Sequence, residues 1–268
     1  LNTGYHRLKS TCKTTYQSSD SIVEKSVFAY DTERPYNIIS KSSLCSGGAE
    51  QVERTYYSNN TIPDKESLTT SQRSAIQLLT SRNYLTTPVQ QTMEKKDKRL
   101  YSVLRGYSSS LSSGMVVEDQ YYCKGTDKYE KRISYNKYDI YGNPVYINKD
   151  GAEKVVYLWG YKGQYLLAEI KGATYEEVKK ALMVDPASMS SCILPSIPLY
   201  LDMIDNLYKA LPSALITSYT YHPLIGISGI ISPNKAKTTF EYNSDSQLIR
   251  IKDTEGKTME EYQYHFRP

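Results

Sequence analysis

The sequence predicts a mainly β protein in which antiparallel hairpins follow one another as a meander, with a few short helices inserted. Short stretches of alternating polar and apolar residues recur along the chain, and turn residues separate them. The aromatic residues are 27 Tyr against 3 Phe and 1 Trp, which suits pleated sheets with one face in water. A third observation, Asp150-Gly151 between two such stretches, is typical of a two-residue hairpin turn.

The first 57 residues predict four strands. They are bounded by turn residues, namely Ser18-Ser19-Asp20, Arg34-Pro35 and Ser46-Gly47-Gly48. The predicted strands are 7–16, 21–30, 36–44 and 50–57. Regular spacing of this kind favours a meander over alternating β-α units.

Residues 58–105 predict one helix between a loop and extended segments. The loop covers 59–64, and a helix over 71–82 is followed by Asn83, a residue that can end it. One face of this helix carries Ala75, Leu78, Leu79 and Arg82. Pro88 disfavours helix at the residue before it, so 84–92 is expected to be extended. The charged run 94–99 predicts a solvated hairpin tip.

Alternation returns between residues 100 and 165. It is clearest in 132–138 and 144–149. Asp150-Gly151 connects the second of these strands to a further strand over 153–161. A primed turn needs positive φ at both central residues, which Asp and Gly tolerate.

Residues 172–212 predict a helical insertion. Thr174 and Glu177 have the spacing of a capping box, and the helix they begin is expected to stop before Asp185-Pro186. A second helix over about 200–211 ends at Pro212. Its apolar face is formed by Leu201, Ile204, Tyr208 and Leu211. Two amphipathic helices this close are expected to pair and cover part of a sheet.

The last 54 or so residues predict an up-and-down set of three strands, over 238–242, 248–252 and 259–266. We divide the chain into an N-terminal hairpin region, 1–105, and a second β region, 106–268, that contains the helical insertion. The two regions could also form one continuous domain.

One segment carries a recognisable motif. Its residues are Tyr138-Asp139-Ile140-Tyr141-Gly142-Asn143-Pro144, the Asp150-Gly151 turn, and Tyr157-Leu158-Trp159-Gly160-Tyr161. This pattern resembles the YD repeat of bacterial RHS proteins. Residues 242–248 are similar to a second copy, with Asn243 for Asp and Ser246 for Gly. Segments 220–227 and 159–178 also resemble parts of long family members.

The resemblance implies a structural or adhesive module of an exported, secreted or surface-attached bacterial protein without catalytic machinery. Its partner would be the rest of a larger YD-repeat chain or another surface protein. A chain that begins at Leu1 rather than Met is expected to be processed or a fragment. The repeat residues, which are also candidate ligand contacts, are Tyr135, Tyr138, Asp139, Tyr141, Gly142, Asn143, Trp159 and Tyr161.

Two alternatives keep the same scaffold. Rows of exposed Tyr beside Asn, Asp and Gln suit carbohydrate binding, in which a ring packs on a sugar face; further candidates are Tyr56-Tyr57 and Tyr121-Tyr122. Tyrosine ladders that hold hairpins together are the commoner use of this pattern. The other alternative is a shell fragment of a toxin-delivery protein, although no self-cleavage motif surrounds Asp185-Pro186.

No pattern in the sequence predicts a catalytic, metal or cofactor site. His6, His222 and His265 lie far apart, and Asp202 and Asp205 on a helix are more simply a solvated face than an acid/base pair. The four cysteines, Cys12, Cys45, Cys123 and Cys192, form no CxxC pair, which disfavours zinc but leaves disulfides and free thiols open.

The charge balance and hydropathy disfavour two kinds of partner. A formal charge of +4 from 33 basic and 29 acidic residues spread along the chain gives no strong footprint for nucleic acid. No stretch reaches the roughly 18 consecutive apolar residues of a membrane-spanning helix.

Overall fold

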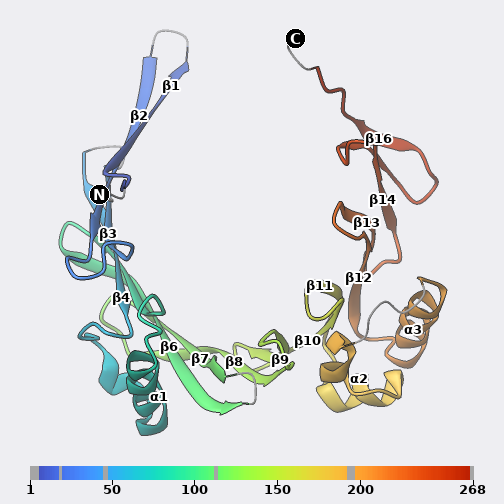
Figure 1. Ribbon diagram of the computed structural model, residues 1–268, viewed down its shortest axis with the longest axis horizontal. Coiled ribbons are helices and arrows are strands. Elements are labelled where there is room, and N and C mark those ends of the chain that lie inside the picture. Colours follow the sequence, from blue (N-terminus) through green and yellow to red (C-terminus); the bar gives the residue numbers. More distant parts are fainter. Residues whose placement is uncertain (1–5, 18–19, 45–47, 112–113, 192–196, 266–268) are drawn as a thin grey trace, which may run out of the picture. The chain divides into compact units, whose positions relative to one another are not determined.

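The computed structural model describes residues 6–17, 20–44, 48–111, 114–191 and 197–265. Within these residues, strand order follows chain order from β1 to β16, and neighbouring strands pair antiparallel (Figure 1). The predicted fold class, a mainly β hairpin meander with a few short helices, is therefore confirmed. The chain divides into two compact units, Leu1–Ser134 and Tyr135–Pro268. The predicted division at 105/106 falls inside β6.

The first unit contains the N-terminal strands and one α-helix. Its strands are β1 (Ser10–Gln17), β2 (Asp20–Tyr30), β3 (Ile38–Leu44), β4 (Glu50–Tyr57), β5 (Pro88–Lys95), β6 (Lys98–Leu111), β7 (Gly114–Lys124) and the first part of β8 (Glu130–Tyr138). The helices are η1 (Lys65–Ser67) and α1 (Thr70–Ser81). The predicted hairpin tip is present, since Lys95 pairs with Lys98 across the β5–β6 turn.

Helix α1 covers the core of this unit. Thr69 and Gln72 form a capping box at its start, and Asn83 follows its end with φ +63°. The core cluster is Ile62, Leu68, Ala75, Ile76, Leu79, Val89, Leu104, Tyr107 and Tyr121. Two details of the prediction were wrong. The buried face includes Gln72 and Ile76, whereas Arg82 is exposed. The extended segment begins at Pro88, because Leu85 and Thr86 form a turn.

The second unit contains the remaining strands and the helical insertion. Its strands are β9 (Pro144–Lys149), β10 (Glu153–Gly160), β11 (Tyr165–Lys171), β12 (Leu215–His222), β13 (Gly226–Ile231), β14 (Lys237–Tyr242), β15 (Leu248–Lys252) and β16 (Thr258–Glu261). The helices are α2 (Tyr175–Leu182), η2 (Pro186–Ser191) and α3 (Ile197–Ala210).

The two predicted helices pair and cover strands β10, β11 and β12. Thr174 and Glu177 form the predicted capping box, and Met183 ends α2 in the left-handed conformation. The core cluster is Val156, Leu158, Leu167, Ala168, Ile170, Ala173, Val178, Leu182, Met189, Ile204, Leu207 and Ile216. Helix and sheet therefore share one apolar layer. The structure begins α3 at Ile197, about three residues before the predicted start.

The turn after β9 has the predicted geometry. Asp150 and Gly151 have φ values of +47° and +73°, and the Ala152 N–H donates to the Lys149 carbonyl at 3.0 Å. The last predicted strand was too long. β16 ends at Glu261 rather than 266: its last pair is Glu261 with Arg250, and beyond it a single backbone hydrogen bond joins the Tyr262 N–H to the Ile249 carbonyl at 3.0 Å. Phe266 lies outside the described residues.

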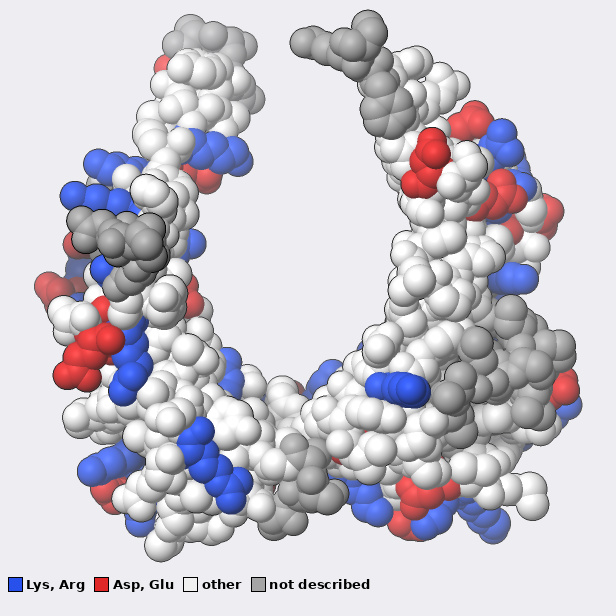
Figure 2. Space-filling model, viewed as in Figure 1, with Lys and Arg blue, Asp and Glu red and all other residues white. Residues whose placement is uncertain are grey.

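Charged side chains of both signs are mixed on the face of the molecule that Figure 2 shows. Figure 2 shows Lys and Arg interspersed with Asp and Glu over the visible face, without a patch of one sign. Ion pairs across strands account for part of this mixture, as between Arg250 on β15 and Glu261 on β16, 3.0 Å apart. No helix among the residues described is long and apolar enough to cross a membrane.

Candidate functional site

The YD motif forms a closed five-residue turn between β8 and β9. Asp139 Oδ1 accepts hydrogen bonds from the Tyr141 N–H at 2.9 Å and the Asn143 N–H at 2.8 Å. The Asp139 N–H in turn donates to the Asn143 carbonyl at 2.9 Å. Gly142 occupies the left-handed region with φ +86°, which a residue without Cβ adopts at no steric cost. One carboxylate oxygen thus accepts from two backbone N–H groups of the turn, and the Asp139 carbonyl accepts from a third, that of Gly142, at 3.2 Å.

The same turn recurs twice near the C-terminus. Asn243 and Asp253 each accept with Oδ1 from the N–H groups two and four residues on, at 2.8–3.0 Å. Each also donates its own N–H to the carbonyl four residues on, and Ser246 and Gly256 have φ values of +63° and +80°. Asn provides the same acceptor as Asp, so the second copy keeps the geometry despite its departures from the motif.

The first of these turns is tied to the neighbouring turn between β10 and β11. Asn143 Nδ2 donates to Asp139 Oδ2 at 3.0 Å and to the Gly163 carbonyl at 2.8 Å. Gly163 has φ +75°, and a Cβ there would lie 2.7 Å from atoms of both Asn143 and Tyr141. The Gly163 N–H donates to the Ser190 carbonyl in η2 at 3.1 Å. Gly163 was missed from the sequence because its role depends on a residue 20 positions away.

The structure brings Asp139, Tyr141, Gly142 and Asn143 together and places the other repeat aromatics nearby in the sheet. Trp159 Nε1 donates to the Pro144 carbonyl at 2.8 Å. Tyr161 packs edge-on against Tyr165 with ring centroids 5.0 Å apart, and Tyr165 packs on Tyr221 at 4.6 Å. Burial raises the pKa of Tyr221 to about 12. These tyrosine rings pack on one another within the sheet, and the Tyr221 hydroxyl donates to the Leu166 carbonyl at 2.7 Å.

The remaining predicted tyrosines differ in environment. Tyr135 and Tyr138 stack on each other with centroids 6.0 Å apart. Tyr121, expected in an exposed row, is instead buried in the first unit, and its hydroxyl lies 3.2 Å from Asp119 Oδ2. The alternation of β7 places this ring on the face that α1 covers. Tyr57 donates its hydroxyl to the Ile38 carbonyl at 3.0 Å. Several of the tyrosines proposed to contact a sugar therefore already use their ring or their hydroxyl in contacts within the protein.

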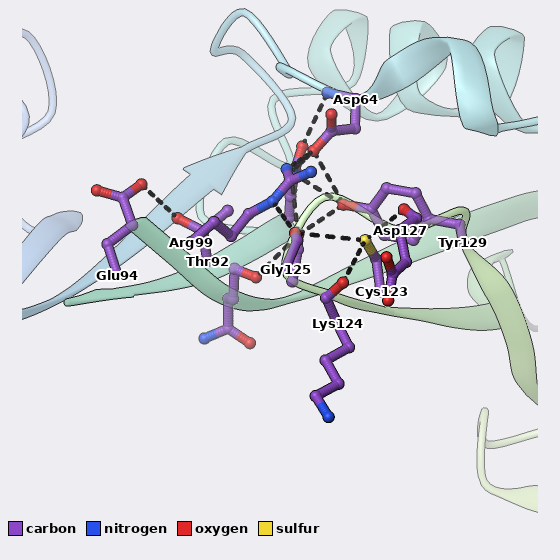
Figure 3. A network of polar contacts seen from close by, with 12 residues as sticks. Asp64, Thr92, Glu94, Arg99, Cys123, Lys124, Gly125, Asp127 and Tyr129 are labelled. Carbon is purple, nitrogen blue, oxygen red and sulfur yellow. Dashed lines mark hydrogen bonds and ion pairs between the residues drawn. The ribbon is translucent and has the colours of Figure 1, made fainter. Parts of the chain in front are cut away.

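A polar network in the first unit was not predicted. Figure 3 shows Arg99 and Tyr129 converging on the carboxylate of Asp64, with Arg99 Nη1 at 2.6 Å and the Tyr129 hydroxyl at 2.9 Å from Oδ2. Gln90 Nε2 donates to the same oxygen. Below it, Cys123 Sγ lies 2.8 Å from the Asp127 carbonyl, and burial raises the pKa of this thiol. A raised pKa favours the protonated thiol, as is typical of a buried cysteine in apolar surroundings.

A second polar cluster surrounds the buried carboxylate of Asp119, under α1. Gln72 Nε2 donates to Asp119 Oδ2 at 3.0 Å, and Lys131 Nζ lies 3.1 Å from the same oxygen. Ser134 Oγ lies 2.8 Å from Asp119 Oδ1. Gly106 makes room for the amide, since a Cβ there would lie 2.4 Å from Gln72 Cδ. All these partners come from distant segments, so no local sequence signal marks the cluster.

The groups considered for metal or acid/base chemistry are the histidines, the cysteines and the pair Asp202 and Asp205. In the part of the chain that the structure describes, no three His, Cys, Asp or Glu residues are grouped to hold a metal ion. Asp202 and Asp205 are exposed on α3. Cys12 is an exposed free thiol and Cys123 a buried one, whereas Cys45 and Cys192 lie outside the described residues.

Comparison with known proteins gives a distant likeness to parts of toxin complexes. No protein-family model and no curated protein matches the chain. A crystal structure of TcdB2-TccC3-Cdc42 matches 86% of the chain with 12% identity and a TM-score of 0.35. The structure of the Photorhabdus luminescens Tc holotoxin pore, with a mutated TccC3, is 11% identical in sequence and has a TM-score of 0.36. The crystal structure of TcdB2-TccC3 without its hypervariable C-terminal region is 9% identical in sequence and also has a TM-score of 0.36. The chain spans 11–12% of these chains. Values at this level do not assign the chain to a family.

Proposed function

We propose that this chain is a non-enzymatic structural module of an exported bacterial YD-repeat protein. The observation that carries the proposal is the recurrence of one side-chain-closed turn at Asp139, Asn243 and Asp253. A turn closed by its own first side chain fixes hairpin register without help from a ligand. Successive hairpins can therefore extend one sheet, as repeat proteins do. Because further hairpins can extend the sheet in this way, we propose the rest of a larger YD-repeat chain as the partner.

The hydrogen bonding of three carboxylates supports a role without catalysis. The carboxylates of Asp64, Asp119 and Asp139 all accept several hydrogen bonds from protein groups. A general acid or base needs an oxygen within reach of substrate, and these oxygens are directed at the fold's own donors.

A glycan array with the purified chain tests the proposal against the carbohydrate alternative. A structural module should give no saturable signal on any glycan. Saturable binding that is lost in a Tyr135→Ala, Tyr138→Ala double variant would overturn the proposal in favour of a glycan-binding module. Tyr264→Ala, an exposed tyrosine 45% accessible near the C-terminus, is the matched control.

A further inference from the structure

In the first unit, the face of the sheet that α1 does not cover contains a pocket. Side chains alternate between the two faces of a strand. Gln90 points toward Asp64, in the loop before α1, so its neighbour Gln91 points to the opposite face. The pocket lies on this opposite face, over strands β2 to β5, and has a volume of about 390 Å³. This volume is near the lower end of the range for small-molecule sites, roughly 300–1,000 Å³, so the pocket suits a small ligand.

Four of the residues that line the pocket are apolar. They are Phe28, Ile38, Tyr57 and Pro88. The Tyr57 hydroxyl donates to the Ile38 carbonyl at 3.0 Å, which holds the ring beside Pro88, its partner in the strand register. Phe28, Tyr57 and Pro88 are half-buried, so each offers part of its surface to a ligand. Aromatic and aliphatic side chains in such a lining receive the apolar group of a ligand.

Two opposite charges line the same pocket. In the register of the sheet, Lys41 lies opposite Glu53 on one side and Phe28 on the other. Facing residues of this kind have Cβ atoms about 5 Å apart. Neither Lys41 nor Glu53 makes a side-chain hydrogen bond or ion pair with any residue that the structure describes. By contrast, Arg250 and Glu261, which also face each other, pair at 3.0 Å. The pocket thus presents an ammonium and a carboxylate side by side.

Gln91 adds a hydrogen-bond donor with a fixed direction. Its Oε1 accepts from Arg105 Nη2 at 2.9 Å, and because a guanidinium only donates, the amide oxygen must face Arg105. Gln91 Nε2 has no partner among the described residues. Arg105 Nη1 is buried without a partner, and Arg105 makes no ion pair in the same part of the chain. With Lys41 and Glu53, the pocket and the residue behind it hold two cations and one carboxylate, which favours a ligand carboxylate.

We propose that this pocket binds a free α-amino acid with an apolar side chain. The ligand carboxylate contacts Lys41 Nζ and Gln91 Nε2, its ammonium contacts Glu53, and its side chain packs on Phe28 and Tyr57. An α-amino acid fits better than a simple carboxylic acid, because it carries both charges on one carbon and so matches the facing pair on β3 and β4. A sugar would leave both charges without a counter-ion. This binding role goes beyond the structural role proposed above.

A ligand-detected NMR titration of the full chain tests this inference. L-phenylalanine and L-leucine should bind saturably, with a Kd of about 1 mM or lower. Two analogues of phenylalanine each lack one charge: 3-phenylpropionate has no ammonium, and phenethylamine has no carboxylate. Both should bind about tenfold or more weakly than phenylalanine, because one charged group of the pocket then stays without a partner. Glycine, which lacks the apolar group, should also bind more weakly.

Two variants assign the charges of the ligand to the side chains. Glu53→Gln should weaken L-phenylalanine about tenfold without weakening 3-phenylpropionate, whereas Lys41→Gln should weaken both ligands about tenfold. The matched control is Glu24→Gln, because Glu24 is an exposed carboxylate on the same face of β2 as Phe28 and does not line the pocket. This variant should leave both affinities unchanged. Circular dichroism of each variant confirms that the fold is retained.

Three results contradict the inference. The first is no saturable binding of either amino acid; a loss of stability in both pocket variants would then assign the two charges to an ion pair between β3 and β4. The second is equal affinity for L-phenylalanine and 3-phenylpropionate, which would make the pocket a site for apolar carboxylates. The third is binding of L-phenylalanine that Lys41→Gln and Glu53→Gln affect no more than Glu24→Gln, which would place the amino acid elsewhere on the chain.

Discussion

At the scale of single residues, Asp139 is the residue whose side chain closes the turn of its motif. It accepts from two backbone N–H groups and from the Asn143 amide, and it is buried. Asp139→Ala leaves these donors unpaired, and we expect a loss of about 2 kcal/mol or more in the free energy of unfolding. Urea denaturation measures it. The control is Asn243→Ala, in the half-buried copy of the turn, with an expected loss of about 1 kcal/mol. Equal losses would show that burial is irrelevant.

Gly163 offers a second test at this scale, because Gly151 has nearly the same backbone conformation without close neighbours. Their φ values are +75° and +73°, but a Cβ at Gly151 meets nothing within 4 Å. Gly151→Ala should cost about 1 kcal/mol for the conformation alone. Gly163→Ala should cost a further 1–3 kcal/mol or so, since Asn143 and Tyr141 must move. Similar denaturation midpoints for the two variants would contradict the close packing.

At the scale of elements, Asp185 connects α2 to η2. Asp185 accepts from the Tyr175 hydroxyl and from the Ala187 N–H at 3.0 Å, and Lys179 Nζ lies 3.0 Å from its other oxygen. Burial opposes ionisation, but the hydrogen bonds from Tyr175 and Lys179 outweigh it and lower the pKa of Asp185 below its ordinary value. The ionised carboxylate therefore stabilises the folded state at neutral pH.

The expected pH dependence follows from the sign of this shift. A folded-state pKa below the unfolded value of about 4 gives stability that is present above pH 4 or so and is lost as the pH falls through the folded value. Asp185→Asn should lower stability at pH 7 and flatten the decline below pH 4. Urea titrations at several pH values measure this. Asp205→Asn, on the exposed side of α3, should leave the profile unchanged. A profile of Asp185→Asn parallel to the original would refute the role of this carboxylate.

Elements whose cause is local could be predicted from the sequence. The capping box at Thr174, the turn at Asp150-Gly151 and most strand positions depend on residues within five positions of one another. The end of β16 was not predicted, because Tyr262, Tyr264 and Phe266 continue the alternation of the sequence beyond the last paired residue, Glu261. The Asp64 network and the Gly163 contact could not be predicted either, since their partners lie 20–65 residues apart. The four motif residues of the Asp139 turn were predicted, but Gly163, whose carbonyl accepts a hydrogen bond from Asn143, was not.

At the scale of the whole molecule, each compact unit has its own apolar core. The first core lies between α1 and the strands around β6, and the second between α2, α3 and β10 to β12. Neither cluster contains residues of the other unit. Truncation of a core residue should therefore destabilise one unit selectively, by about 2–5 kcal/mol for Leu→Ala.

The single tryptophan makes this separation measurable. Trp159 belongs to the second unit, so its fluorescence reports the unfolding of that unit, whereas far-ultraviolet circular dichroism reports both. Leu158→Ala, at a fully buried site in the second core, should move the fluorescence midpoint to lower urea concentration. Leu104→Ala, equally buried in the first core, should leave that midpoint in place while part of the circular dichroism signal is lost earlier. If both variants shift the fluorescence midpoint by the same amount, the chain unfolds as one cooperative body and the two cores are coupled.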